Sequence, residues 1–253
     1  ILPPMSQRIE DLLHRRSDVS AFLVHLTRDI HPRRARQNLL EILATRTLLA
    51  STPMGVGSAQ WDRDPEFRES QRVVCFTETP LEHVWMMCED ISGRAVNMQP
   101  YGLAVTKSWA RRRAVNPVFY VDITRGHDWL TNAFDELLNH AVAAPQPLAT
   151  SAIARLLPFV EPMGQPASVR REFSWEREWR HVGDLTFGYD DLVVVFVPES
   201  DHDQFASDIN NRLGAYPNSS ERRVRLIDPR WGQTRMLSAL ANVADADLGP
   251  FPR

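Results

Sequence analysis

Residues 21–27 read Ala-Phe-Leu-Val-His-Leu-Thr, a short apolar run that predicts a buried strand. After a turn at Pro32, residues 34–49 carry leucine and isoleucine at helical spacing. The apolar side chains that share one broad face of this predicted helix are Leu39, Leu40, Ile42, Leu43 and Leu49. A buried strand followed by an amphipathic helix is the clearest structural signal in the chain.

The other predicted strands and helices follow in an irregular order. Strands are predicted at 72–79, 101–107, 117–123, 173–180, 192–198 and 222–227. Helices are predicted at 6–17, 81–90, 202–214 and 232–243, and over 128–157 with a break at two prolines. Residues 192–198 are wholly apolar and predict a central strand, whereas residues 51–70 predict a long loop and 161–171 a linker. Because strands and helices do not alternate regularly, the sequence favours a mixed α+β fold over a doubly wound parallel sheet.

The composition is that of an ordinary globular protein. Of the 253 residues, 43% are hydrophobic and 24% charged, which excludes a disordered or collagenous chain. The net charge of −3 excludes nucleic-acid binding through bulk charge alone and leaves a local basic groove open. Two cysteines cannot build a disulfide framework, so the cytoplasm is the expected location. No apolar stretch approaches the ~18 residues of a membrane span, so no membrane partner is expected.

We expect one domain over residues 5–245, with the residues at both ends lying outside it. Met5 is the expected natural start, and residues 1–4 are interpreted as an addition before it. Residues 246–253 contain two prolines and predict a flexible tail. The N-terminal residues lack a basic region followed by an apolar run, so no signal peptide is predicted.

Common catalytic motifs are missing from the sequence. It has no GxGxxG, Walker loop, HExxH, CxxC or GxSxG, so the sites that these motifs build are unsupported. Asp201, His202 and Asp203 precede a predicted helix and are interpreted as a capping cluster rather than a metal site. Cys75 lies among apolar residues and is interpreted as a buried thiol, with a nucleophile paired to a histidine as the alternative.

The segment Glu-Arg-Glu-Trp-Arg at 176–180 is the strongest candidate for chemistry. If it is a strand, alternation places Glu176, Glu178 and Arg180 on one face. Two neighbouring carboxylates repel each other, which raises one pKa and suits acid–base work or the stabilisation of a cation. The alternative is an edge strand whose polar face lies in water.

Further candidate site residues lie within or just after the predicted strand at 21–27. His25 shares a strand face with Thr27, and either binds a ligand or is a hydrogen-bonded core residue. Arg28 follows at the strand end, where a guanidinium can bind a phosphate.

The positive charge of the chain comes almost entirely from arginine. Lys107 is the only lysine, which we attribute to a bias in codon usage toward arginine.

The order of several short motifs resembles a known family. His-x-Thr-Arg at 25–28 is followed by Asn-Leu-Leu at 38–40, Val-Cys-Phe-Thr-Glu-Thr-Pro-Leu at 74–81 and Tyr-Gly-Leu-Ala-Val at 101–105. Asn-Pro-Val-Phe-Tyr-Val at 116–121 and Trp-Glu-Arg-Glu-Trp-Arg at 175–180 complete the series. Over roughly residues 21–198 this order resembles the AbiGi family of abortive phage resistance proteins, which are usually labelled as antitoxins.

The layout is similar, more distantly, to ADP-ribosyltransferases, including DarT-type enzymes. That resemblance implies a split mixed or antiparallel sheet with flanking helices and NAD as co-substrate. It implies that Glu178 is catalytic with Glu176 two residues before it. The residues that it implies for NAD binding are His25, Leu26, Thr27, Arg28, Trp61, Phe76 and Thr77. A carboxylate beside the ribose would stabilise the oxocarbenium charge that develops as nicotinamide leaves.

Two hypotheses follow from the resemblances. The first is an NAD-dependent ADP-ribosyltransferase in phage defence, with a nucleic acid or a protein as acceptor. Arginines at 33–36 and 111–113 are then candidate phosphate contacts, with solvated turns as the alternative. The second is a non-catalytic antitoxin of the AbiGi type that binds a partner toxin with the same fold.

Overall fold

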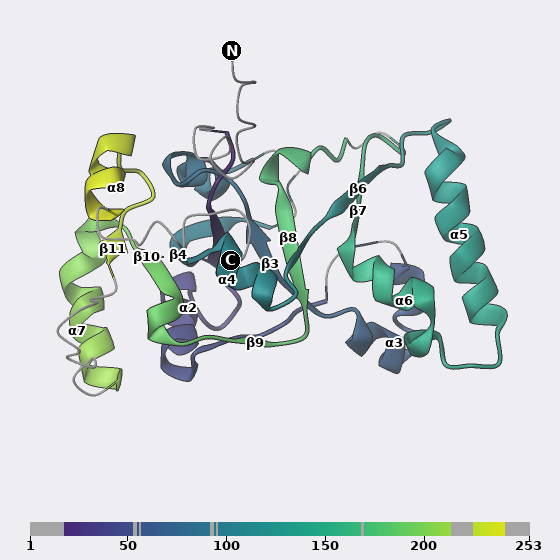
Figure 1. Cartoon of the computed structure of the whole chain (residues 1–253), viewed down its shortest axis with the longest axis horizontal. Coiled ribbons are helices and arrows are strands. Elements are labelled where there is room, and N and C mark those ends of the chain that lie inside the picture. Colours follow the sequence, from purple (N-terminus) through teal and green to yellow (C-terminus); the bar gives the residue numbers. More distant parts are fainter. Residues whose placement is uncertain are drawn as a thin grey trace, which may run out of the picture.

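A seven-stranded sheet forms the centre of the computed structural model, which describes residues 18–52, 55, 57–91, 94, 96–167, 170–213 and 225–240 (Figure 1). The sheet strands, in spatial order, are β11 (Leu226–Ile227), β10 (Leu192–Phe196), β4 (Met98–Thr106), β1 (Phe22–Arg28), β3 (Val73–Thr77), β8 (Glu178–Val182) and β5 (Asn116–Pro117). Two small sheets pair β2 (Thr47–Leu48) with β9 (Leu185–Thr186) and β6 (Phe119–Asp122) with β7 (Val160–Met163). The expected helix 6–17, the start at Met5 and the tail 246–253 lie outside the described residues.

Helices flank the sheet and extend beyond it. The α-helices are α2 (Ala35–Thr45), α3 (Pro65–Ser70), α4 (Lys107–Arg112), α5 (Asp128–Ala143), α6 (Ala152–Leu156), α7 (His202–Leu213) and α8 (Gln233–Leu240). Short 3₁₀ segments are η1 (Ser58–Gln60), η2 (Leu81–Cys88), η3 (Leu148–Thr150), η4 (Leu157–Phe159), η5 (Ser174–Glu176), η6 (Tyr189–Asp191) and η7 (Glu199–Asp201). In the described ranges, no helix is both long and apolar enough to cross a membrane.

The pairing directions make the main sheet mixed. β1 is antiparallel to both β3 and β4, and β3 is antiparallel to β8, whereas β10 and β11 are parallel. The expected α+β class with a mixed or antiparallel sheet is therefore confirmed. The strand at the middle of the sheet is β1, and β10, predicted as a central strand from 192–198, is an interior strand with β11 on one side and β4 on the other. β10 is apolar throughout because hydrophobic clusters cover both of its faces.

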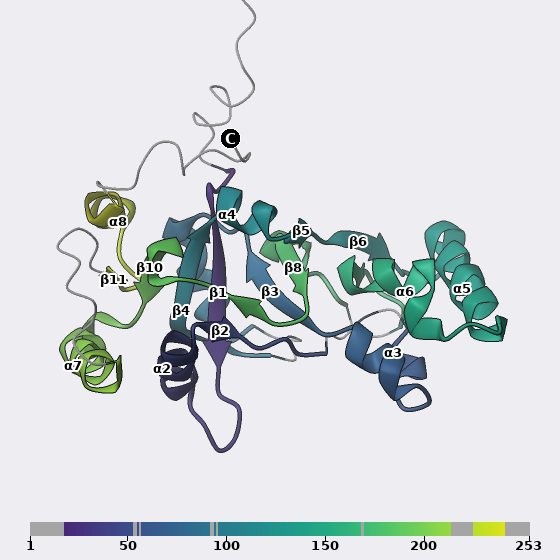
Figure 2. The ribbon, with the colours of Figure 1, turned by 60° about the horizontal axis from the view of Figure 1, so that its bottom comes forward.

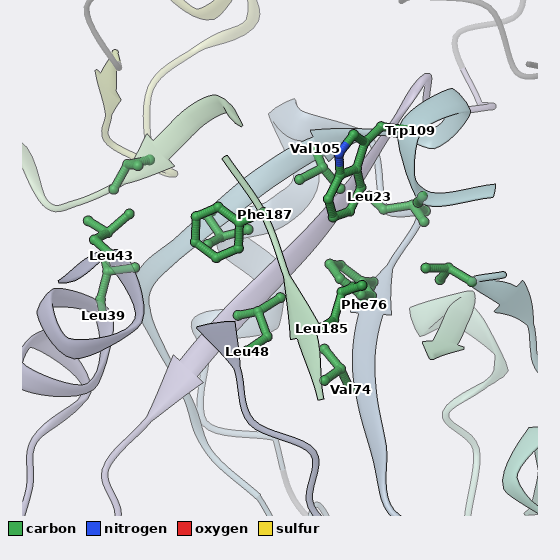
Figure 3. Packing of buried hydrophobic residues seen from close by; sticks show 14 of the residues in the cluster. Leu23, Leu39, Leu43, Leu48, Val74, Phe76, Val105, Trp109, Leu185 and Phe187 are labelled. Atoms are coloured by element: carbon green, nitrogen blue, oxygen red, sulfur yellow. The ribbon is translucent and has the colours of Figure 1, made fainter. Parts of the chain in front are cut away.

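One sheet face packs against α2 and α7. Leu23 of β1 and Phe76 of β3 belong to the same cluster there as Leu39 and Leu43 of α2, and Figure 3 shows Phe187, Leu48 and Leu185 in the space between them. Phe205 of α7 is fully buried in the same cluster. On the opposite face, a second cluster joins the sheet to η2 and α8. Since each apolar residue buried in this way contributes about 1.5–3 kcal/mol, the two clusters fix the sheet between its helices.

Helix α2 ends four residues before its predicted end. Arg46 has a φ of 54°, in the left-handed region, which terminates the helix at Thr45. Leu48 then turns inward as part of β2 and is buried, whereas Leu49 is 70% exposed. The prediction that the helix reaches residue 49 and buries Leu49 was wrong, because a leucine run does not reveal where the backbone turns.

The predicted loop 51–70 contains a helix. The Asp64 carboxylate accepts a hydrogen bond from the backbone N–H of Phe67 at 2.8 Å, and Pro65 occupies the first turn of α3. Phe67 is fully buried in a third cluster, with Leu157 and Leu138. The loop prediction was wrong over 65–70, where Asp-Pro was a helix start signal.

A group of elements beyond the main sheet contains α3, α5, α6 and the β6–β7 pair. Both views place it at the opposite end of the molecule from α7 and α8 (Figure 1, Figure 2). The break that the prolines predict in 128–157 is confirmed, since α5 ends at Ala143 and α6 begins at Ala152. The predicted linker 161–171 begins instead within strand β7.

Candidate functional site

The chain approaches β8 through a turn. Residues 174–176 form η5, and Arg177 has a φ of 49°, so the strand begins only at Glu178. The prediction of a strand over 173–180 was wrong before Glu178. Glu178 and Arg180 do share a strand face, but Glu176 lies in the preceding turn. The hydroxyl of Thr77 on β3 donates a hydrogen bond to the backbone carbonyl of Glu176, which ties this turn to the sheet.

Arg180 is the centre of a buried polar group. Its Nε and Nη2 atoms donate to the two carboxylate oxygens of Glu178 at 2.9 and 2.8 Å. Nη2 also lies 2.5 Å from Oε2 of Glu161 on β7, and Nη1 donates to the carbonyl of Pro158 at 2.9 Å. Only 3% of the Arg180 side chain is exposed. The charge of Glu178 is thus compensated inside the protein by a bidentate ion pair.

Glu176 is the carboxyl of this group whose pKa is most clearly raised. Burial raises the pKa of Glu176 to about 7, and the charges of Glu178 and Glu161 act in the same direction. Arg94 opposes this shift, with its Nη2 atom 3.1 Å from Oε1 of Glu176. A carboxyl with such a pKa gains and loses a proton near neutral pH. We call Arg94, Glu161, Glu176, Glu178 and Arg180 the glutamate–arginine cluster.

Two further groups border the glutamate–arginine cluster. The Tyr120 hydroxyl accepts a hydrogen bond from the backbone N–H of Glu178 at 2.8 Å, and burial raises the pKa of Tyr120. Burial, followed by the Glu178 charge, raises the pKa of the Cys75 thiol well above its usual range. A thiol in this state does not supply the thiolate that a cysteine hydrolase needs, which favours the interpretation of Cys75 as structural.

A second buried ion group centres on Glu78, just after β3. Its Oε1 atom lies 2.8 Å from Nζ of Lys107 and 3.2 Å from Nη2 of Arg177. Its Oε2 atom accepts a hydrogen bond from the Trp179 indole at 2.7 Å. Burial lowers the pKa of Lys107, although Glu78 opposes the shift. The only lysine of the chain is therefore a buried ion-pair partner, which the count of lysines by itself did not reveal.

His25 and Glu178 lie on opposite faces of the sheet. Val24 pairs with Thr77, and Thr77 pairs with Glu178, so these three side chains share a face. His25 therefore points to the other face, where its ring contacts Phe76 edge-on with centroids 5.8 Å apart. Its Nδ1 atom donates to the carbonyl of Cys75 at 2.8 Å, and burial lowers the pKa of His25, which keeps the ring neutral.

The other residues expected to bind NAD have structural contacts. The Thr27 hydroxyl lies 3.0 and 2.9 Å from the carbonyls of Ala35 and Tyr101, and Leu26 is buried in the cluster under η2. The carbonyl of Arg28 accepts a hydrogen bond from Asn38 at the end of β1. Trp61 packs against the cluster that contains Phe67. The structure thus brings Thr77, Glu176 and Glu178 together, while His25, Thr27 and Phe76 face the other side of the sheet.

Comparison with protein families identifies the chain. A family model described as "Putative abortive phage resistance protein AbiGi, antitoxin" matches residues 66–221, which is more than half of the sequence. The chain belongs to the AbiGi family. The resemblance that its motifs carry is therefore confirmed. No curated protein and no solved structure matches it.

The AbiGi match contains both buried ion groups. It runs from α3 to beyond α7 and includes all five residues of the glutamate–arginine cluster. It also includes Glu78 and Lys107, as well as helix α5. Strand β1, which carries His25, precedes the matched region. The matched region of the chain thus includes both groups of buried carboxylates.

Proposed function

We propose that this AbiGi protein is an antitoxin that acts in abortive phage defence by binding a toxin, without catalysis of its own. The observation that carries the proposal is the family match over residues 66–221, whose description names an antitoxin. The proposal includes a single domain over 5–245 and a cytoplasmic location, where a toxin of an abortive infection system would act.

The geometry of Glu178 supports a binding role. Both of its carboxylate oxygens are held by Arg180, which is itself only 3% exposed. A protein cation on both oxygens competes with the developing positive charge of a substrate for this carboxylate. Glu178 in this arrangement stabilises the protein, and the neutral, hydrogen-bonded His25 on the other sheet face adds nothing to it.

The test is co-expression with the protein encoded by the neighbouring gene. We expect that protein to arrest growth when expressed alone, and we expect this chain to restore growth and to co-purify with it. The variant Glu178→Gln, if folded, should neutralise the toxin as well as the wild type does. Failure of the wild-type chain to restore growth or to form a complex would contradict the proposal.

The second candidate function is NAD-dependent ADP-ribosyl transfer to a nucleic acid or a protein. The observation that favours it is Glu176, because a carboxyl with a pKa of about 7 beside a second carboxyl suits a general base. Against it, the residues expected to hold NAD do not converge on one side of the sheet: His25 and Thr27 face away from Glu178.

Labelled NAD distinguishes the two functions. The purified chain is incubated with labelled NAD and with total RNA, DNA and cell protein, alongside Glu176→Gln and Glu178→Gln. Label that appears in one fraction and disappears with either variant would establish the enzyme and its acceptor. If the chain is an antitoxin without catalysis, we expect that no nicotinamide is released and no label is transferred.

A further inference from the structure

Helix α5 exposes part of its apolar face to solvent. Trp129 is 87% exposed and Leu137 is 54% exposed, although both are residue types that proteins usually shelter. Trp129, Ala133 and Leu137 follow one another at four-residue spacing, which places them in a row along one side of the helix. Figure 2 shows α5 at the end of the molecule, beyond the main sheet.

The rest of the apolar face of α5 is already used for packing. Leu138 is buried, and Phe134 and Ala141 pack against the cluster that holds α3 and α6. These residues pack α5 firmly against the rest of the protein, so the exposed row belongs to a helix that is held in place. The row therefore presents an apolar surface in a defined orientation.

A strand residue extends this surface. Phe119 of β6 is 51% exposed, and its ring lies 6.5 Å from that of Phe134. Phe134 precedes Leu137 by three residues and is its neighbour on the helix. We define Phe119, Trp129, Ala133 and Leu137 as the α5 patch. An exposed apolar surface that contains aromatic side chains is typical of a protein-binding site.

The aspartate and glutamate residues of α5 are not balanced by lysine or arginine, and its one basic residue is His140 in the last turn. The helix carries Asp128, Asp135 and Glu136 and contains neither lysine nor arginine. Glu136 follows Ala133 by three residues, which places its carboxylate beside the exposed row. Asp128 and Asp135 are at positions that face away from this row, so a partner that covers the α5 patch would bring a flanking residue next to the Glu136 carboxylate, which arginine or lysine would complement.

We propose that the α5 patch is the docking site for the toxin, and that the toxin contributes an apolar helix face flanked by arginine or lysine. This inference rests on the proposed antitoxin function. A row of side chains at four-residue spacing forms a ridge that fits a groove of a second helix, and an apolar helix face is a common mode of recognition between proteins. Trp129 acts as the anchor, since exposed tryptophans that become buried on binding supply a large share of the affinity.

The first experiment removes the apolar row from the full-length chain. Trp129→Ser with Leu137→Ser should weaken the complex with the neighbouring gene's protein by at least about 100-fold, since two anchor residues are lost. Leu49→Ser is the matched control, because Leu49 is 70% exposed at another place in the fold. We expect Leu49→Ser to change the dissociation constant less than twofold. The thermal unfolding of both variants should match that of the wild type, which excludes misfolding as the cause.

The second experiment reverses one charge. Glu136→Arg should weaken the complex roughly tenfold and slow association, because it places a cation opposite the partner's basic residues. Glu41→Arg is the control, since Glu41 is an exposed acidic residue on α2. Added salt should weaken the wild-type complex and have less effect on Glu136→Arg.

The outcomes separate this inference from the function on which it rests. If the wild-type chain binds the neighbouring gene's protein and the Trp129/Leu137 variant binds it equally well, the α5 patch is not the docking site and the antitoxin proposal stands. If the wild-type chain binds nothing and restores no growth, both proposals are wrong. If light scattering shows a dimer that the double variant converts to a monomer, the patch binds a second copy of this chain instead.

Discussion

Both carboxylate oxygens of Glu178 are held by one guanidinium, that of Arg180, at 2.9 and 2.8 Å. The same guanidinium reaches Glu161 on β7, so it connects the main sheet to the β6–β7 pair. Three contacts of this kind require the planar fork of arginine, because an ammonium group cannot donate two parallel hydrogen bonds to one carboxylate.

Arg180→Lys should therefore destabilise the protein, although it keeps the positive charge. We expect the free energy of unfolding to fall by about 2 kcal/mol, the value of a lost hydrogen bond to a charged group. Urea unfolding followed by circular dichroism measures the effect. Arg170→Lys is the control, because Arg170 pairs with Glu172 at the surface, and its change should stay within about 0.5 kcal/mol. Equal stability of the two variants would mean that the Arg180 fork is not needed.

Glu176 should make the stability depend on pH. Folding raises the pKa of this carboxyl to about 7, so the folded protein binds the proton more tightly than the unfolded chain does. The contribution of Glu176 then favours folding below the unfolded pKa of about 4.5 and is lost as the pH rises through 7. We expect it to lower the free energy of unfolding by about 3 kcal/mol between roughly pH 4 and pH 8.

Urea unfolding of Glu176→Gln at a series of pH values tests this dependence. In the variant, the free energy of unfolding should fall less steeply as the pH rises. The fall that remains should come from Glu161, whose pKa is also raised by burial. Glu172→Gln, at the surface, should leave the pH profile of the wild type unchanged. A profile of Glu176→Gln that coincides with the wild-type profile would show that Glu176 ionises normally in the folded protein.

Lys107 should resist amine-reactive reagents in the folded protein. Its side chain is 4% exposed and its ammonium group is paired with Glu78. A lowered pKa by itself would make Lys107 react faster with an acetylating reagent in the native protein than in the unfolded chain, whereas burial makes it react more slowly. The sign of this difference in rate therefore separates the two effects. We expect Lys107 to react at least about tenfold faster in urea than in the native protein, as followed by mass spectrometry. The variant Arg68→Lys supplies an exposed lysine as an internal reference, and Lys107 reacting as fast as that lysine would contradict the burial.

Gly102 should be irreplaceable by alanine. A Cβ atom at this position of β4 would lie 2.3 Å from the backbone carbonyl oxygen of His25 on β1, and a backbone atom cannot move aside cheaply. Gly102→Ala should therefore cost about 2 kcal/mol or more of stability and lower the midpoint of urea unfolding. Gly232→Ala is the control, since a Cβ there would meet nothing within 4 Å. Wild-type stability of Gly102→Ala would imply that β1 and β4 separate without cost.

The sequence by itself determined the elements whose signals are local. The apolar run at 21–27 became β1, and the leucine-rich stretch after it became α2, because burial and helical spacing depend on residues a few positions apart. The alternation that put Glu178 and Arg180 on one face also held. The family followed from the order of short motifs along the chain. Local backbone turns broke the pattern elsewhere: left-handed Arg46 ended α2, and left-handed Arg177 kept Glu176 out of β8.

Only the tertiary structure decided which side chains meet. Strand register put His25 and Glu178 on opposite faces, and a shift of one residue would have reversed that result. Lys107 pairs with Glu78, which is distant in the sequence, because Lys107 follows β4, Glu78 follows β3, and both strands lie next to β1. The exposure of Trp129 likewise depends on how much of α5 its neighbours cover. Contacts between distant segments arise from the packing of whole elements, and no local pattern of residues encodes them.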